Sequence, residues 1–285
     1  MSQPWSVQGR TVMVTGATDG IGLETARELA RRGARLLLHG RDEGRAAAAR
    51  RDIRSSTGND DVEIVLADYT SLDQVRGLAG DVHGLTDRLH VLVDNAGVYQ
   101  ERRHLTADGC ETTFQVNHLA PFLLTNLLLD LLLAAAPSRV VVVSSGAHQR
   151  AAVDLRDLQG ERRYDGHSAY GLSKLGNLLF TYELARRLEG SGVTVNALHP
   201  GVVSTKLLRA GFRSSGGASP SEGARTAVYL ASSPDVAGVT GGYYVNERPA
   251  TSSAASYDRE LQAAFWAISE ELSGLAAEPR SSAVG

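Results

Sequence analysis

Short apolar runs alternate with helical patterns along almost the whole chain, and this alternation constrains the fold more than any other feature. The runs that predict strands are residues 12–14, 35–39, 62–66, 89–93, 139–143, 193–198 and 243–245. The segments between them carry apolar residues three and four positions apart, which is the spacing of one helix face. Strands that alternate with helices form a parallel sheet with helices on both faces. We therefore expect one doubly wound α/β domain over residues 1–275, followed by a disordered tail at residues 276–285.

Composition favours a globular protein and excludes several classes. The chain has 285 residues, of which 42% are hydrophobic and 21% charged. Its net charge of −3 does not indicate binding to nucleic acid. Cys110 is the only cysteine, so no disulfide forms within the chain, and we interpret it as a packed or surface thiol. Residues 1–9 show no apolar signal segment, and polar residues and a proline interrupt the apolar run at residues 119–136. We therefore expect a cytoplasmic protein with no membrane partner.

Three further segments carry structural expectations. Residues 112–133 predict one long Leu-rich helix, and residues 168–189 predict a second. These two helices either pair across the axis of a homo-oligomer or lie wholly inside one chain. Residues 202–220 are rich in Gly and Ser, with Leu207, Leu208 and Phe212 embedded, which suits a mobile lid over an apolar substrate.

A glycine cluster follows the first predicted strand and precedes a helical pattern. Its residues, Thr15 to Gly22, include Gly16, Thr18, Asp19, Gly20, Ile21 and Gly22. Strand, glycine turn and helix form the context of a dinucleotide-binding turn, where backbone N–H groups at the helix start face the phosphates. The spacing differs from the commoner Gly-x-Gly-x-x-Gly, and a plain tight turn is the alternative. The helix behind the cluster favours dinucleotide binding, and the whole pattern predicts a single domain of Rossmann type.

The end of the second predicted strand indicates which dinucleotide binds. NAD-binding folds commonly place an acidic residue about 20 positions after the glycines, where it holds the ribose 2′-hydroxyl. Here Gly40 and Arg41 stand at that place, so no carboxylate repels a 2′-phosphate and a guanidinium can bind one. A solvated surface arginine is the alternative interpretation. The pair favours NADP(H), with NAD(H) as the second choice, while Asp19 in the phosphate turn argues against NADP(H).

Tyr170 and Lys174 lie four positions apart on the second long helix and therefore share one face. A nearby ammonium favours the phenolate, so we expect Lys174 to lower the pKa of Tyr170. A tyrosine tuned in this way exchanges a proton with a carbonyl or alcohol oxygen. A tyrosine and a lysine at this spacing also occur by chance on solvated helices, so the pair depends on its context.

That context resembles the short-chain dehydrogenase/reductase family, and within it the retinol-dehydrogenase-like branch. The resemblance covers roughly residues 10–272 and rests on the segments 15–22, 94–97 and 170–174, on Asn117 and Ser145, and on Pro200 and Gly201. The branch is indicated by the segments 114–119, 122–127, 199–201 and 242–272. The resemblance implies that Tyr170 is the acid/base, that Ser145 binds the substrate oxygen, and that Lys174 holds the nicotinamide ribose. It also implies that Asn117 anchors a proton-relaying water. The cofactor would further contact Asp68, Asn95, Ala96, Gly97, Pro200, Gly201, Val203 and Thr205.

Departures from the family pattern limit what the resemblance implies. Asp94 stands where Asn is usual, and Asp19 replaces the basic residue of many NADP enzymes. Membrane-bound retinol dehydrogenases carry an N-terminal anchor, which residues 1–9 do not resemble, so a retinoid substrate does not follow.

Other kinds of chemistry are disfavoured. The eight histidines form no His-Glu-x-x-His helix, so no metal is expected. Ser145 is not preceded by the glycine of a hydrolase nucleophile elbow. We expect an enzyme that acts on a small-molecule carbonyl or alcohol, and the alternative is a non-catalytic dinucleotide-binding regulatory module on the same fold.

Overall fold

The computed structural model describes residues 5–212 and 216–275. Its centre is an eight-stranded sheet of order β3-β2-β1-β4-β5-β6-β7-β8 in which only the last pairing, between β7 and β8, is antiparallel. The chain builds outward from β1 to β3 and then crosses back to β4, and ligands bind at such a reversal point. The strands are β1 Thr11–Val14, β2 Arg35–Gly40, β3 Val62–Leu66, β4 Val91–Asp94, β5 Ser138–Val143, β6 Val193–His199, β7 Tyr243–Val245 and β8 Arg248–Pro249.

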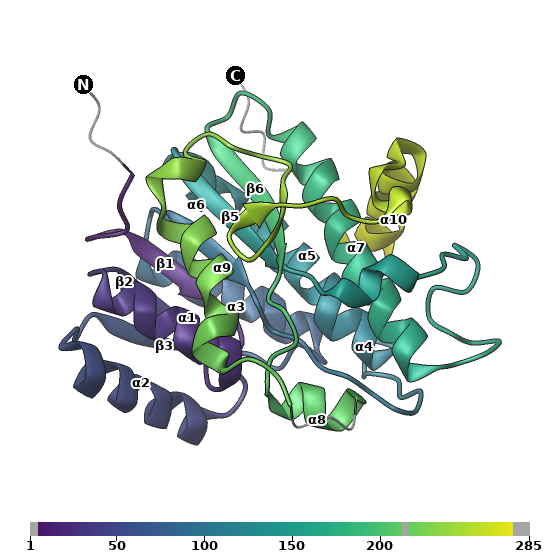
Figure 1. Ribbon diagram of the computed structural model, residues 1–285, viewed down its shortest axis with the longest axis horizontal. Helices are drawn as coiled ribbons and strands as arrows, with labels where there is room; N and C mark the ends of the chain where they lie inside the picture. The colour runs from purple at the N-terminus through teal and green to yellow at the C-terminus, as the bar shows by residue number, and fades with distance from the viewer. Residues whose placement is uncertain (1–4, 213–215, 276–285) are drawn as a thin grey trace.

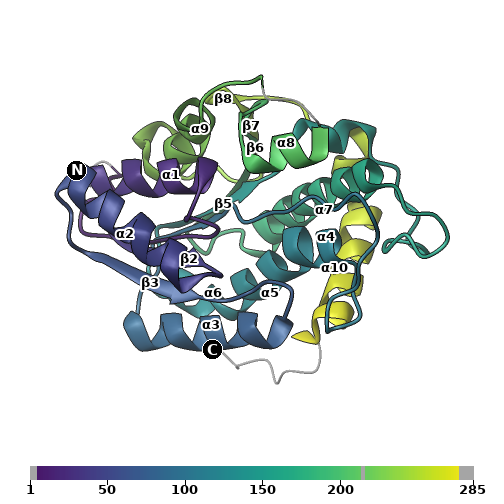
Figure 2. The same cartoon turned by 90° about the horizontal axis from the view of Figure 1, so that it is seen from below.

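Helices cover both faces of this sheet (Figures 1 and 2). One face carries α1 Gly20–Arg31, α2 Glu43–Thr57 and α9 Pro220–Ser232, and the other carries α3 Leu72–Leu85, α5 Ala120–Leu127, α6 Leu129–Ala134 and α7 Gly166–Arg187. Successive strand residues point to opposite faces, so Val12 and Val14 enter the first core and Met13 the second. Both cores consist of buried apolar side chains from the sheet and the helices, which holds the carboxyl ends of the strands in place.

Helix α10, Arg259–Ser273, packs outside α7 and α5 (Figure 2). Its Phe265 and Trp266 are buried, and the ring of Trp266 lies 4.9 Å from Phe122 of α5 and 5.8 Å from Phe180 of α7. The two Leu-rich helices are therefore covered by a later part of the same chain.

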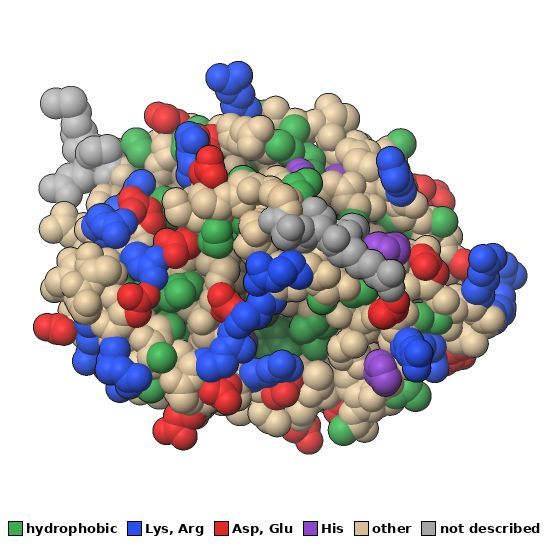
Figure 3. All heavy atoms as spheres, turned by 60° about the horizontal axis from the view of Figure 1, so that its bottom comes forward, with side chains coloured by type: hydrophobic (Ala, Val, Ile, Leu, Met, Phe, Trp, Pro, Cys, Tyr) green, Lys and Arg blue, Asp and Glu red, His purple; other side chains and the backbone are tan. Residues whose placement is uncertain are grey.

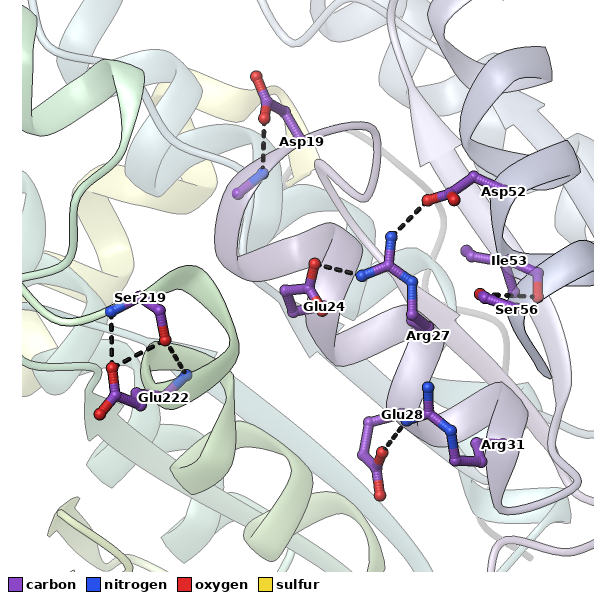
Figure 4. A network of polar contacts seen from close by, with 11 residues as sticks. Asp19, Glu24, Arg27, Glu28, Arg31, Asp52, Ile53, Ser56, Ser219 and Glu222 are labelled. Atoms are coloured by element: carbon purple, nitrogen blue, oxygen red, sulfur yellow. Dashed lines mark hydrogen bonds and ion pairs between the residues drawn. The ribbon is translucent and has the colours of Figure 1, made fainter.

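Local polar contacts fix the starts of the helices that flank the site (Figure 4). Asp19 caps α1 by accepting a hydrogen bond from the N–H of Gly20. Arg27 of α1 pairs with Glu24 and with Asp52 of α2, which joins the two helices. Helix α9 begins with a reciprocal capping box between Ser219 and Glu222.

The doubly wound sheet expected from the sequence is confirmed, and β3 and β7 have the predicted bounds. The antiparallel strand β8 was not expected. The expected tail at residues 276–285 lies outside the described residues.

The expectation of one continuous helix at residues 112–133 is wrong. This segment consists of α4 Thr112–Phe114, a π turn at Gln115–Leu119, α5 and α6. The N–H of Ala120 donates to the carbonyl of Gln115, five residues back, and Pro121 has no N–H for the carbonyl of Asn117, four residues back. Pro121 thus explains why the regular hydrogen-bond ladder cannot pass Asn117.

The segment at residues 202–220, which we expect to be a mobile lid, contains regular structure. Helix α8 spans Lys206–Phe212, and a β-bridge between Val203 and Ala218 closes the base of the segment. The side chain of Phe212 and residues 213–215 lie outside the described part of the chain.

Two broader expectations can be compared with the described residues. No described helix is both long and apolar enough to cross a bilayer. The described side chains include no cluster of His, Cys, Asp and Glu suited to a metal, and Cys110 is buried.

Candidate active site

A cavity of about 670 Å³ opens at the carboxyl ends of β1, β4, β5 and β6. Figure 3 shows a hollow with hydrophobic side chains inside and Lys and Arg side chains gathered around it. Of the residues predicted from the sequence, all but Asn117 line the cavity: Gly16, Thr18, Asp19, Gly20, Ile21, Gly22, Arg41, Asp68, Asn95, Ala96, Gly97, Ser145, Tyr170, Lys174, Pro200, Gly201, Val203 and Thr205. The fold therefore brings together residues from most of the length of the sequence.

Glycines leave bare backbone where α1 begins. Gly16 has a φ of +63°, and a Cβ there would lie 2.9 Å from the Cα of Ala96. A Cβ on Gly22 would lie 2.4 Å from the carbonyl oxygen of Gly16. Neither position has room for a side chain, so the backbone forms the cavity wall. The first N–H groups of a helix have no acceptor within it, so the turn fits the phosphates of a dinucleotide.

Asn95, just after β4, and His39, in β2, brace this turn from the two sides of β1. The Nδ2 of Asn95 donates to the carbonyls of Thr15, at 2.8 Å, and Gly16, at 3.3 Å. The Nδ1 of His39 accepts from the N–H of Gly16 at 3.2 Å, and its Nε2 lies 3.1 Å from the carbonyl of Ala67. A carbonyl only accepts, so Nε2 carries the proton and the ring is neutral. Burial favours this state because it lowers the pKa of His39 to about 4.

Asp19 is held by two cations from different helices. Its Oδ2 lies 2.6 Å from Nζ of Lys206 on α8 and 3.2 Å from Nη2 of Arg45 on α2. The hydrogen bond from Lys206 is the largest influence that lowers the pKa of Asp19. The negative charge that the sequence sets against NADP(H) is thus accompanied by two positive charges at the same place.

Gly40 and Arg41 lie beside this cluster. A Cβ on Gly40 would lie 2.4 Å from Cγ2 of Thr18, so packing alone accounts for this glycine. Arg41 is exposed and lines the cavity together with Arg45. Asp68 also lines it, and its Oδ1 accepts from the N–H and the hydroxyl of Thr70, both at 2.9 Å. The argument for a 2′-phosphate therefore rests on the two arginines.

Tyr170 and Ser145 meet on the opposite side of the cavity. Ser145 follows β5 and caps a short 3₁₀ helix, η2 Gly146–Arg150, by accepting from the N–H of Ala147. Tyr170 lies in the first turns of α7 and is buried. Burial raises the pKa of Tyr170 to about 12, and a hydrogen bond with Ser145 acts in the other direction. The expectation of a lowered tyrosine pKa is therefore wrong here, and the phenol carries its proton at neutral pH.

Lys174 lies behind Tyr170, one helical turn along α7. Its Nζ donates to the carbonyl of Val143 at 3.0 Å and lies 5.8 Å from the centroid of the Tyr170 ring. Burial lowers the pKa of Lys174 to about 8. The ammonium is thus fixed beside the tyrosine, and its charge is sensitive to pH just above neutrality.

Asn117 lies behind the cavity wall, in the π turn. Its Oδ1 accepts from the N–H of Val98 at 2.7 Å, and its Nδ2 donates to the carbonyl of Val98 and the hydroxyl of Ser173, both at 3.0 Å. A Cβ on Gly97 would lie 3.3 Å from this Oδ1 and 3.5 Å from Nζ of Lys174. Asn117 therefore ties the segment after β4 to α7 close to Lys174.

The segment after β6 closes the cavity on the side of α8. The Oγ1 of Thr205 accepts from the N–H of Leu208 at 3.2 Å, and its Cγ2 would lie 3.4 Å from a Cβ on Gly20. Leu207 and Leu208 line the cavity. Helix α8 thus brings apolar side chains and Lys206 over the same opening.

Several residues at the site were not singled out from the sequence: His39, Arg45, Tyr99, Arg150 and Lys206. Arg45 stands four positions after Arg41, and Lys206 directly follows Thr205, so spacing could have indicated both. Tyr99 has no comparable signal. Its ring lies 6.3 Å from that of Tyr170, and a Cβ on Gly211 of α8 would lie 2.9 Å from it.

Comparison with known proteins agrees with this geometry. The profile of the short chain dehydrogenase family matches residues 10–214. Human retinol dehydrogenase 14 is 41% identical, with 95% of this chain and 88% of that protein covered, and human polyprenol dehydrogenase is 39% identical, with 93% and 86% covered.

Solved structures give the same result. A crystal structure of an uncharacterised protein from Mycobacterium paratuberculosis has a TM-score of 0.80 and 36% identity, and the match covers 95% of this chain and 96% of that one. The RhlG/NADP active-site complex of Pseudomonas aeruginosa has a TM-score of 0.70 and 28% identity, with 85% and 96% covered. The chain is an oxidoreductase that belongs to the short-chain dehydrogenase family and is similar to the retinol dehydrogenases.

Proposed function

We propose that this protein is an NADP(H)-dependent oxidoreductase that interconverts the carbonyl and alcohol forms of a largely apolar small molecule, with Tyr170 as the acid/base. The observation that carries the proposal is the meeting of Tyr170, Ser145 and Lys174 in one cavity with the glycine turn. A nicotinamide bound there supplies or accepts the hydride at the substrate carbon.

The protein's own groups act on the substrate oxygen. In the reducing direction, the carbonyl carbon gains a hydride and the oxygen gains the proton of the Tyr170 hydroxyl, which gives the alcohol. Ser145 donates a second hydrogen bond to the same oxygen, where negative charge develops, so both groups favour the transition state. A pKa of about 12 keeps Tyr170 protonated at neutral pH, which suits reduction.

The choice of NADP(H) rests on charge. Arg41 and Arg45 line the cavity beside the glycine turn, and guanidinium groups bind phosphate strongly and in a fixed geometry. The structure of RhlG with NADP supports this choice by similarity. The apolar substrate is supported by Leu207 and Leu208 on α8, and by the similarity to dehydrogenases named for retinol and polyprenol.

The test measures reduction of apolar aldehydes and ketones by wild-type protein, Tyr170→Phe and Arg41→Ala with NADPH and NADH. Tyr170→Phe removes the proton donor and little volume, so we expect kcat to fall by ~10²–10⁴-fold while NADPH affinity is kept. Arg41→Ala should weaken the affinity for NADPH about tenfold and leave the affinity for NADH unchanged, because only NADPH carries the 2′-phosphate. Full turnover by the Phe variant would refute the role of Tyr170. Equal wild-type affinity for both cofactors would refute the preference for NADP(H).

A further inference from the structure

Arg150 is a cation at the cavity that the proposed chemistry does not use. It ends η2, five positions after Ser145, and its exposed side chain lines the cavity. No described residue forms a hydrogen bond or ion pair with its guanidinium, whereas Arg45 and Lys206 share the carboxylate of Asp19. Arg150 therefore offers an unused positive charge to a molecule in the cavity.

The backbone that carries Arg150 is fixed relative to Ser145. The Nδ1 of His148 lies 2.5 Å from the carbonyl of Ser145, and its Nε2 accepts from the N–H of Ser253 at 3.2 Å. On the other side η2 packs on α7, where a Cβ on Gly171 would lie 3.1 Å from the carbonyl of Ala147. A 3₁₀ helix rises about 2 Å per residue, so the Cα of Arg150 stands on the order of 10 Å from that of Ser145.

Arg150 is also separate from the cations of the glycine turn. Those cations gather around Asp19 after β1, while η2 follows β5, which lies two strands away in the sheet. Neighbouring strands are about 4.8 Å apart, so the two positions differ by roughly 10 Å across the sheet. The position of Arg150 therefore suits the substrate rather than the cofactor phosphates.

The cavity surface between these groups is mainly apolar. Val98, Val116, Val202, Leu207 and Leu208 all line it. A substrate whose oxygen reaches Tyr170 and Ser145 would lay its chain against these side chains, and its far end would come within reach of a guanidinium.

We propose that Arg150 binds a carboxylate at the far end of the substrate, so that the enzyme prefers amphipathic carbonyl compounds with an aldehyde or ketone at one end and an acid at the other. This inference rests on the proposed function and names its substrate class. The guanidinium forms charge-assisted hydrogen bonds to the carboxylate, which fix which end of the molecule enters. Neutral aldehydes remain substrates, because the apolar walls and the reacting groups serve them equally.

The experiment compares three aldehydes of one chain length: azelaic semialdehyde, its methyl ester, and nonanal. Each is reduced with NADPH by wild-type protein, Arg150→Gln and Arg150→Lys. Arg156→Gln is the matched control, because Arg156 is an 80% exposed arginine of the same connection that does not line the cavity. We expect wild-type kcat/KM for the acid to exceed that for the ester by about tenfold, the low end for a charged hydrogen bond at an exposed site.

Arg150→Gln should remove this preference and leave kcat/KM for nonanal unchanged. Arg150→Lys should keep part of the preference, because the positive charge remains but the planar guanidinium is lost. The preference should also shrink as salt rises, which a purely structural role would not produce. Arg156→Gln should behave as wild type. Equal wild-type kcat/KM for acid and ester, or an equal loss on all three aldehydes in Arg150→Gln, would overturn the proposal.

A binding measurement separates this inference from the proposed function. Calorimetric titration of nonanoate into the protein in the presence of NADP⁺ requires no turnover. We expect Arg150→Gln to weaken the affinity for nonanoate about tenfold. Absence of nonanal reduction would count against the proposed function. Nonanoate binding that is absent, or identical in wild type and Arg150→Gln, would count against the role of Arg150.

Discussion

Burial shifts the pKa values of Tyr170 and Lys174 in opposite directions. Both side chains are buried, and a buried group resists its charged form, so the pKa of Tyr170 rises to about 12 and that of Lys174 falls to about 8. The phenol is therefore an acid at neutral pH, while the ammonium begins to lose its charge just above it. The pKa values of these two residues depend on desolvation more than on the attraction between them.

Asp94 shows the same effect at the end of β4. Its Oδ2 accepts from the Thr125 hydroxyl at 2.8 Å, but its Oδ1 has no hydrogen-bond partner among the described residues. Burial raises the pKa of Asp94 from 3.8 to about 7. Because the folded-state pKa is the higher one, ionisation destabilises the fold. The penalty is absent below pH 3.8, grows up to about pH 7 and is constant above it.

Asp94→Asn should therefore stabilise the protein. The amide keeps the size of the side chain and an acceptor for Thr125 but carries no charge. We expect the free energy of unfolding to rise by about 1–3 kcal/mol at pH 8 and the gain to vanish towards pH 4, as measured by urea denaturation at both values. Asp81→Asn on the exposed face of α3 is the control and should change little. A gain that does not depend on pH would show that Asp94 is not the titrating group.

Residue types and spacing predict well which side chains meet in the cavity, but they predict the electrostatics of these side chains poorly. Tyr170, Lys174 and the glycine turn are visible because their spacing is local. The ion pair between Asp19 and Lys206 is not, because it joins residues that are far apart in the sequence. Gly40 is a related case, since a Cβ there would lie 2.4 Å from Cγ2 of Thr18, which favours a glycine without reference to a cofactor.

At the scale of elements, α8 is attached to the glycine turn through Lys206. The side chains of Lys206 and Asp19 are 72% and 46% exposed, so this ion pair adds little to global stability. It nevertheless joins the helix that carries Leu207 and Leu208 to the start of α1. Its effect should therefore be local order rather than stability of the whole fold.

Lys206→Gln tests this attachment. We expect the free energy of unfolding to change by less than about 0.5 kcal/mol, while the backbone amides of α8 exchange hydrogen faster and those of α1 do not. Arg209→Gln, an exposed change on the same helix, should leave exchange unaltered. Unchanged exchange in α8 of the Lys206 variant would show that the contact does not order the helix.

The π turn marks where element prediction from sequence ends. Leu-rich periodicity correctly places a helical segment at residues 112–133, but periodicity does not distinguish hydrogen bonds four residues apart from those five apart. Pro121 is visible in the sequence, and it lies four positions after Asn117. A proline at that distance from Asn117 could have indicated the irregular turn.

At the scale of the whole molecule, α10 occupies the outer surface of the two Leu-rich helices. Phe265 and Trp266 are buried there, and the guanidinium of Arg187 lies 4.0 Å from the Trp266 ring. Of the two arrangements open from the sequence, this packing supports the internal one. The sequence alone could not decide, because α10 is an ordinary amphipathic helix until its partner is known.

We accordingly expect that α5 and α7 form no interface between copies of the chain. Native mass spectrometry should detect either monomers or oligomers. If oligomers form, chemical cross-links between copies should not involve α5, α7 or α10. Trp266→Ala should lower the free energy of unfolding by about 3–5 kcal/mol, because it leaves a cavity against both helices. Cross-links between the α7 helices of two copies would contradict this arrangement.

The hydrogen bond between His148 and Ser253 has a consequence for synthesis of the protein. The glycine turn lies between β1 and α1, and the strands beside it, β2 and β4, also come from the first part of the chain. The loop of Ser145, however, is held by a residue more than a hundred positions later. The segment that holds the loop of Ser145 is therefore synthesised long after the glycine turn, so this loop gains its hydrogen bond to Ser253 only late in synthesis of the chain.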